Sequence, residues 1–121
     1  MDPLTSALIM AAAASESPII CNLNALSKAE REEHSADTAR LKAAVQKIED
    51  VDGGYRWRLG SQLTAADLLR WVERERRCCS FLDFEIRLGR EDGERWLQMT
   101  GRDGVKAFLA AEFKLTSAGE K

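Results

Sequence analysis

The stretch Asp52-Gly53-Gly54-Tyr55-Arg56-Trp57-Arg58-Leu59-Gly60-Ser61 alternates apolar and charged side chains between two glycine-containing turns. Successive side chains of a strand point to opposite faces of its sheet, so strict alternation indicates a strand with one buried face. The aromatic and aliphatic side chains are predicted to face a core, and both arginines to face water. Helices with one apolar stripe would cover the buried face, which favours a sheet with helices on one side.

Upstream, Ser27-Lys28-Ala29-Glu30 matches a helix capping box, in which serine and glutamate satisfy free backbone N–H groups. We expect a helix from there to about Glu49, ended by the glycines that follow. Its second half carries an apolar stripe at helical spacing, whereas its first half places Glu30, His34 and Thr38 on the same line. Before this helix, Pro18 to Leu23 has the composition of a short strand.

Downstream, Thr64-Ala65-Ala66-Asp67 resembles a second helix cap, and a helix is predicted from there to about Cys78. Its core side is predicted to be Leu68, Leu69 and Val72, and its wet side Arg70, Arg74 and Arg77. A strand from Phe81 to Leu88, an Asp-Gly turn and a strand from Arg95 to Thr100 form a predicted hairpin. A short helix from Val105 to about Phe113 follows, with Asp103 as its expected N-cap.

These elements predict an α+β fold in the order β-α-β-α-β-β-α. The expected architecture has two layers, with an about four-stranded, largely antiparallel sheet, two long helices and one short C-terminal helix. Residues 18–115 are predicted to form this single domain. Residues 1–17 are expected to be a flexible N-terminal segment, and residues 116–121 a loose tail.

The composition excludes some classes of function. Of 121 residues, 31% are charged, and the net charge is −2 with both signs interleaved, which gives no support for nucleic-acid binding. Residues 8–14 are apolar but too short to span a bilayer, and they lack the preceding positive charge of a secretory signal. Three cysteines cannot form a closed set of disulfides, so the cytoplasm is the expected location.

The cysteines are the strongest candidates for chemistry. Cys78 and Cys79 are adjacent at a predicted helix–strand junction, and Cys21 ends the first predicted strand. Adjacent cysteines rarely form a disulfide with each other, because the small ring strains the peptide between them. Three thiolates would suit zinc, copper(I) or another thiophilic metal or metalloid. The alternatives are a catalytic or redox thiol and cysteines that only fill the core.

Two polar residues are candidates for supporting such a site. His34 is the only histidine, and it lies on the stripe that becomes apolar further along its helix. Glu75 lies one helical turn before Cys78, where it is placed to take a proton from a thiol or to contact a cation. Simpler readings are a hydrogen-bonded, semi-buried histidine and a solvated glutamate. The tryptophans are predicted to be core anchors or part of a homodimer interface.

Several of these residues belong to a pattern that resembles a group of small bacterial proteins of uncharacterised function. The resemblance covers roughly residues 18–113, and its clearest motif is Glu75-Arg76-Arg77-Cys78-Cys79-Ser80-Phe81. Proline commonly follows the paired cysteines in that group, whereas Ser80 stands there in this chain. The group has no established activity to transfer. The resemblance implies that five residues converge: Cys21, His34, Glu75, Cys78 and Cys79.

The sequence therefore predicts a small protein that binds a thiophilic metal or metalloid through Cys21, Cys78 and Cys79, with His34 and Glu75 as support. Zinc is one candidate ion, and sensing, transport and sequestration are candidate roles. A thiol-dependent enzyme or redox protein is the first alternative. A structural or interaction module with inert, buried cysteines is the second.

Overall fold

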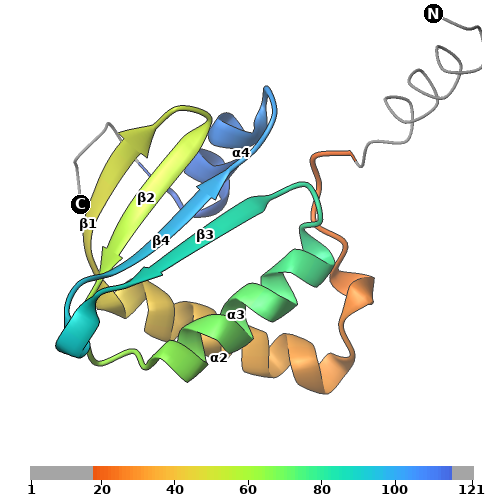
Figure 1. Cartoon of the computed structure of the whole chain (residues 1–121). Helices are drawn as coiled ribbons and strands as arrows, with labels where there is room; N and C mark the ends of the chain where they lie inside the picture. Colours follow the sequence, from red (N-terminus) through yellow and green to blue (C-terminus); the bar gives the residue numbers. More distant parts are fainter. Residues whose placement is uncertain (1–17, 116–121) are drawn as a thin grey trace, which may run out of the picture.

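A four-stranded antiparallel sheet, ordered β1-β2-β4-β3, organises residues 18–115, the part of the chain that the computed structural model describes (Figure 1). The strands β1 (Val45–Val51) and β2 (Gly54–Leu59) form one hairpin, and β3 (Asp83–Leu88) and β4 (Arg95–Thr100) form the other. β2 pairs with β4 at the centre of the sheet. The predicted α+β class is confirmed, while the predictions for residues 1–17 and 116–121 lie outside the described residues.

Three α-helices pack against this sheet: α2 (Lys28–Ala44), α3 (Ala65–Cys78) and α4 (Val105–Glu112). Two short 3-10 helices, η1 (Leu23–Ala25) and η2 (Arg90–Asp92), lie in the connections. The chain thus runs through a helix and a hairpin twice before it reaches α4. In Figure 1, α2 and α3 lie beside each other under the sheet.

The core lies between the sheet and the helices. Trp57 of β2 and Trp71 of α3 are almost fully buried, and Phe113 after α4 packs edge-on to Trp57 with ring centroids 4.9 Å apart. All three helices therefore cover the face of the sheet that carries the apolar residues of β2. The prediction that these alternate residues face the core is confirmed. The other fully buried large side chains are Leu41, Leu68, Leu97, Met99, Val105 and Leu109.

The predicted N-caps of α2 and α3 are present. Ser27 Oγ accepts from the backbone N–H of Glu30 at 3.1 Å, and the Glu30 carboxylate accepts from the Ser27 N–H at 2.9 Å. Thr64 Oγ1 accepts from the Asp67 N–H at 3.0 Å. These contacts satisfy N–H groups that have no partner within the helix, so they fix where α2 and α3 begin.

The first predicted strand is wrong. Residues 18–27 contain η1 and irregular backbone, and this segment lies against the end of α3. The Asn22 side chain accepts from the Asn24 N–H, a local contact that competes with strand pairing. The Asn22 N–H instead donates to the carbonyl of Cys78 at 2.6 Å. The first strand of the sheet is β1, further along the chain.

The predicted end of the first long helix is also wrong, because α2 ends at Ala44 and residues 45–51 form β1. Val51 pairs with Gly54, so Asp52 and Gly53 form a two-residue hairpin turn, with Gly53 at a positive φ of 80° that glycine adopts without strain. At Gly54, a Cβ would lie 1.9 Å from the carbonyl oxygen of Met99. Only glycine lets β4 approach this closely.

Two smaller predictions are corrected, for Leu69 and for the N-cap of α4. Leu69 is 53% exposed, because it lies about 100° around α3 from the buried Leu68. The N-cap of α4 is Gly104, not Asp103, and no side chain caps this helix.

Candidate thiol site at the end of helix α3

The last turn of α3 presents Glu75, Cys78 and Cys79 towards the protein interior. Residues three and four apart lie on one face of a helix, so both sulfurs lie beside Glu75. Cys79 is the C-cap, and its N–H donates to the Glu75 carbonyl at 2.7 Å. All three residues are buried, with exposed fractions of 6% or less.

Cys21 reaches this helix end through the irregular segment before α2. Besides the Asn22 contact, Arg77 donates to the Ala25 carbonyl at 2.9 Å, and Leu26 is buried. Cys21 forms a disulfide with Cys79, with their Cα atoms 4.4 Å apart. The predicted convergence of Cys21 with the pair is therefore observed. The expectation that all three cysteines are thiols is wrong for this oxidised state. Cys21 and Cys79 are far apart in the sequence, so their disulfide avoids the strained small ring that two adjacent cysteines would form.

Cys78 remains a buried free thiol beside the disulfide. Its Sγ lies 3.9 Å from Sγ of Cys79 and 3.7 Å from the carbonyl oxygen of Glu75, to which it can donate. Burial, and then the charge of Glu75, raise the pKa of Cys78 to about 11. This thiol is therefore protonated at neutral pH, despite the neighbouring arginines.

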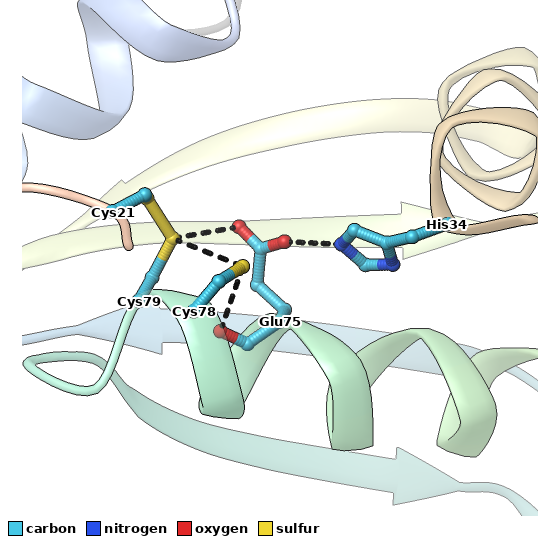
Figure 2. The surroundings of a disulfide bond; sticks show 5 residues. All are labelled: Cys21, His34, Glu75, Cys78 and Cys79. Carbon is cyan, nitrogen blue, oxygen red and sulfur yellow. Dashed lines mark hydrogen bonds and ion pairs between the residues drawn. A yellow bond between two sulfur atoms is a disulfide. The ribbon is translucent and has the colours of Figure 1, made fainter. Parts of the chain in front are cut away.

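The carboxylate of Glu75 lies between the sulfurs and His34 (Figure 2). One oxygen accepts from Nε2 of His34 at 2.7 Å, and the other lies 3.5 Å from Sγ of Cys79. His34 is 8% exposed, and its Nδ1 has no hydrogen-bond partner among the described residues. The predicted support residues His34 and Glu75 thus contact each other, and Glu75 contacts the disulfide.

Ion pairs between α2 and α3, three of which flank His34 and Glu75, place His34 opposite Glu75. Arg70 binds Asp37 at 2.8 Å, Arg74 binds Glu33 at 2.8 Å and Arg77 binds Glu30 at 3.0 Å. These arginines were predicted to face water. Arg70 and Arg77 do so in part, with side chains 40% and 46% exposed, while Arg74 is only 17% exposed, and all three also contact acidic side chains of α2. Their spacing of three to four residues matches that of the acids, read in the opposite direction. The two helices are therefore antiparallel and fixed in register along the side that holds the site.

Trp71 and Thr38, which are hydrogen-bonded to each other, contact His34. Trp71 donates from its indole N–H to Thr38 Oγ1 at 2.8 Å, and that hydroxyl donates to the carbonyl of His34 at 2.8 Å. The Trp71 and His34 rings are stacked, with centroids 5.7 Å apart. The sequence indicated the polar stripe of α2, but it did not indicate that Trp71 packs against this stripe.

The arrangement offers ligand atoms in two overlapping sets. Atoms of Cys21, Glu75 and Cys79 lie within 4.8 Å of one another, as do atoms of His34, Glu75 and Cys78. In the disulfide state, the sulfurs of the first set are bonded to each other and cannot act as thiolates. Reduction would return both to the thiol form beside Cys78.

Comparisons with protein-family models, with curated proteins and with solved structures found no match for this chain. Over residues 18–115, no helix is long and apolar enough to cross a membrane. The candidate site therefore rests on the residues and geometry described above.

Proposed function

We propose that the reduced protein binds a thiophilic metal or metalloid through Cys21, Cys78 and Cys79. The observation that carries this proposal is that all three cysteines meet at one buried helix end, although 58 residues separate Cys21 from Cys79. A thiophilic element needs several sulfurs within reach of one centre. Sensing, transport and sequestration of that element are all compatible with such a site.

The spacing of the sulfurs supports a single centre. Sulfurs bound to one tetrahedral ion at about 2.3 Å lie about 3.8 Å apart. Sγ of Cys78 and Sγ of Cys79 are 3.9 Å apart. The ligand sets within 4.8 Å place Cys21 with Cys79 but not with Cys78, so Cys21 would move towards Cys78 once the disulfide is reduced and complete the set. In that step a dithiol reductant supplies two electrons and two protons, and it becomes a disulfide itself.

The same surroundings give less support to a catalytic thiol. A nucleophilic cysteine acts as thiolate, but the pKa of Cys78 is raised to about 11. Cys79 lies at the negative end of the α3 dipole, where a thiolate is also disfavoured. A metal or metalloid overcomes both effects, because a bond to sulfur replaces the proton.

Titration of the full-length, reduced protein with zinc chloride, cadmium chloride, mercuric chloride and arsenite tests the proposal. Isothermal titration calorimetry should show one tight site per chain for at least one probe. Replacement of any one cysteine by alanine should weaken that binding by at least about a hundredfold, because loss of a ligand costs more than loss of a hydrogen-bond partner of a ligand, which costs about 10- to 100-fold. Glu73→Gln is the control, because Glu73 is an exposed carboxylate on the same helix. Absence of tight binding by all four probes would exclude this function.

The Cys21–Cys79 disulfide favours a second candidate, a protein whose thiols respond to the redox state of the cell. Equilibration with glutathione buffers, followed by alkylation and mass spectrometry, would measure its reduction potential. A potential near that of cytosolic glutathione would support redox sensing there. A much lower potential would make the disulfide structural, and a cytoplasmic location would then lose its support.

A further inference from the structure

We infer that the ligand of the three sulfurs is a neutral trivalent metalloid hydroxide of the arsenous acid class, not a divalent cation. This inference rests on the proposed function and names the class of ligand for that site. Two features carry it: the number of sulfurs that converge, and the buried Glu75–His34 pair beside them.

The net charge of the bound complex separates the two classes of ligand. Glu75 is a buried carboxylate, with one oxygen 3.5 Å from Sγ of Cys79. A divalent cation with three thiolates carries one net negative charge, and it would lie beside this carboxylate in a site that excludes water. Burying uncompensated charge is costly, and two like charges in contact add to the cost. A trivalent element with three thiolates is neutral and adds no charge.

The number of ligands also separates the two classes. Zinc in structural sites takes four protein ligands, and the chain offers three sulfurs here. Nε2 of His34 is bound to one Glu75 oxygen at 2.7 Å, so the fourth ligand would be the other Glu75 oxygen, which lies 3.5 Å from Sγ of Cys79. Zinc with three thiolates and this carboxylate would carry two net negative charges in a buried site, which is costly. Trivalent arsenic or antimony forms three bonds and carries a lone pair, so it needs no fourth ligand.

Solvent has little access to the sulfurs. Cys78 is 4% exposed and Cys79 is 1% exposed, and Cys21 is partly covered. A water molecule as fourth ligand would need space and about three polar partners of its own. The Glu75 carbonyl and one Glu75 carboxylate oxygen already accept hydrogen bonds, which leaves the other carboxylate oxygen as an acceptor beside the sulfurs.

The binding step balances without an oxidant. Each of the three thiols exchanges with one hydroxyl group: an S–H bond and an arsenic–oxygen bond break, while an arsenic–sulfur bond and an O–H bond of water form. Three water molecules leave, and arsenic stays trivalent. No proton is released to solvent, whereas a divalent cation that binds thiols must release protons.

Calorimetry with the full-length reduced protein tests this class of ligand. Arsenite and zinc chloride are titrated separately, each in two buffers of different ionisation enthalpy, so that proton release is measured with affinity. We expect arsenite to bind at least about tenfold more tightly than zinc, with no proton released. X-ray absorption should show three sulfurs around arsenic. Cys78→Ala should weaken arsenite binding at least about a hundredfold, and circular dichroism of the reduced variant checks that it is folded.

Glu75→Gln separates the two classes of ligand, with Glu73→Gln as the matched control. Removing the buried charge should leave arsenite affinity within about twofold and raise zinc affinity. A loss of zinc affinity in Glu75→Gln, or zinc binding tighter than arsenite in the parent chain, would overturn this inference and leave the proposed function standing. Absence of binding by arsenite and by every divalent probe would overturn both.

Discussion

Reduction of the Cys21–Cys79 disulfide should lower the free energy of unfolding by about 4 kcal/mol. The bond closes a loop with a sequence separation of 58 residues. The chain-entropy relation for cross-links gives about 4 kcal/mol at 25 °C for a loop of this length. For a domain of this size, that loss corresponds to a fall in Tm of at least about 15 °C. The reduced protein should remain folded, because its core and the ion pairs between α2 and α3 do not depend on the bond.

Urea denaturation of the full-length protein, with and without a phosphine reductant and with a chelator present, measures this difference. Two variants make the assay specific. Cys21→Ala should lose the response to reductant, and Cys78→Ala should keep it, because Cys78 is the free thiol. A difference below about 1 kcal/mol between the oxidised and reduced parent chain would refute the reasoning, since a closed loop of this length must constrain the unfolded state. Loss of the response in Cys78→Ala would refute the observed pairing.

Two further predictions concern stability. Asp37 is buried, and its hydrogen bond with Arg70, followed by that with Arg40, holds its pKa at about 2 instead of 3.8. A depressed carboxyl pKa stabilises the fold above the pKa of the unfolded chain, so Asp37→Asn should cost about 2 kcal/mol at pH 7. In urea melts across pH, that difference should shrink between about pH 4 and about pH 2; a difference independent of pH would contradict it. On α3, Leu68→Ala should cost about 2–5 kcal/mol and Leu69→Ala less than about 0.5 kcal/mol; equal costs would mean that this helix is rotated from the orientation described.

Local signals in the sequence predicted where α2 and α3 begin, and they predicted the hairpin of β3 and β4. Ser27 with Glu30, and Thr64 with Asp67, act through contacts within one turn, so their sequence pattern predicts them directly. Apolar and charged residues alternate along β2 around Trp57, because helices cover one face of the sheet. This pattern can also be recognised from a few neighbouring residues.

The errors arose where distant partners decide the structure. Residues 45–49 continue the helical spacing of α2, but pairing with β2 makes them a strand. Their β-branched Val45, Ile48 and Val51, and the Asp52-Gly53 pair after them, were the available signals for a hairpin. Pro18 to Leu23 has strand-like composition, but it pairs with neither edge strand of the sheet and instead lies against the end of α3.

The sequence predicted which residues form the site, but not which of them are bonded to each other. Helical spacing placed Glu75 near Cys78 and Cys79, while a motif resemblance grouped them with Cys21 and His34. The disulfide partner of Cys21 depends on how residues 18–26 dock against α3, which no local pattern encodes. The contact between His34 and Glu75 depends on the register of α2 and α3. That register is set by ion pairs whose arginines looked like an ordinary solvated face.

The two helix–hairpin units of the fold are joined by the peptide between Gly60 and Thr64, and also by the disulfide, since Cys21 precedes the first hairpin and Cys79 follows α3. A protease that cuts only in this connection would not divide the oxidised molecule. The fragments would migrate together on a denaturing gel until reductant is added. In the oxidised protein the halves thus stay covalently joined without the connecting loop. In the reduced protein the same cut leaves the halves held by non-covalent contacts, among them those between β2 and β4 and between α2 and α3.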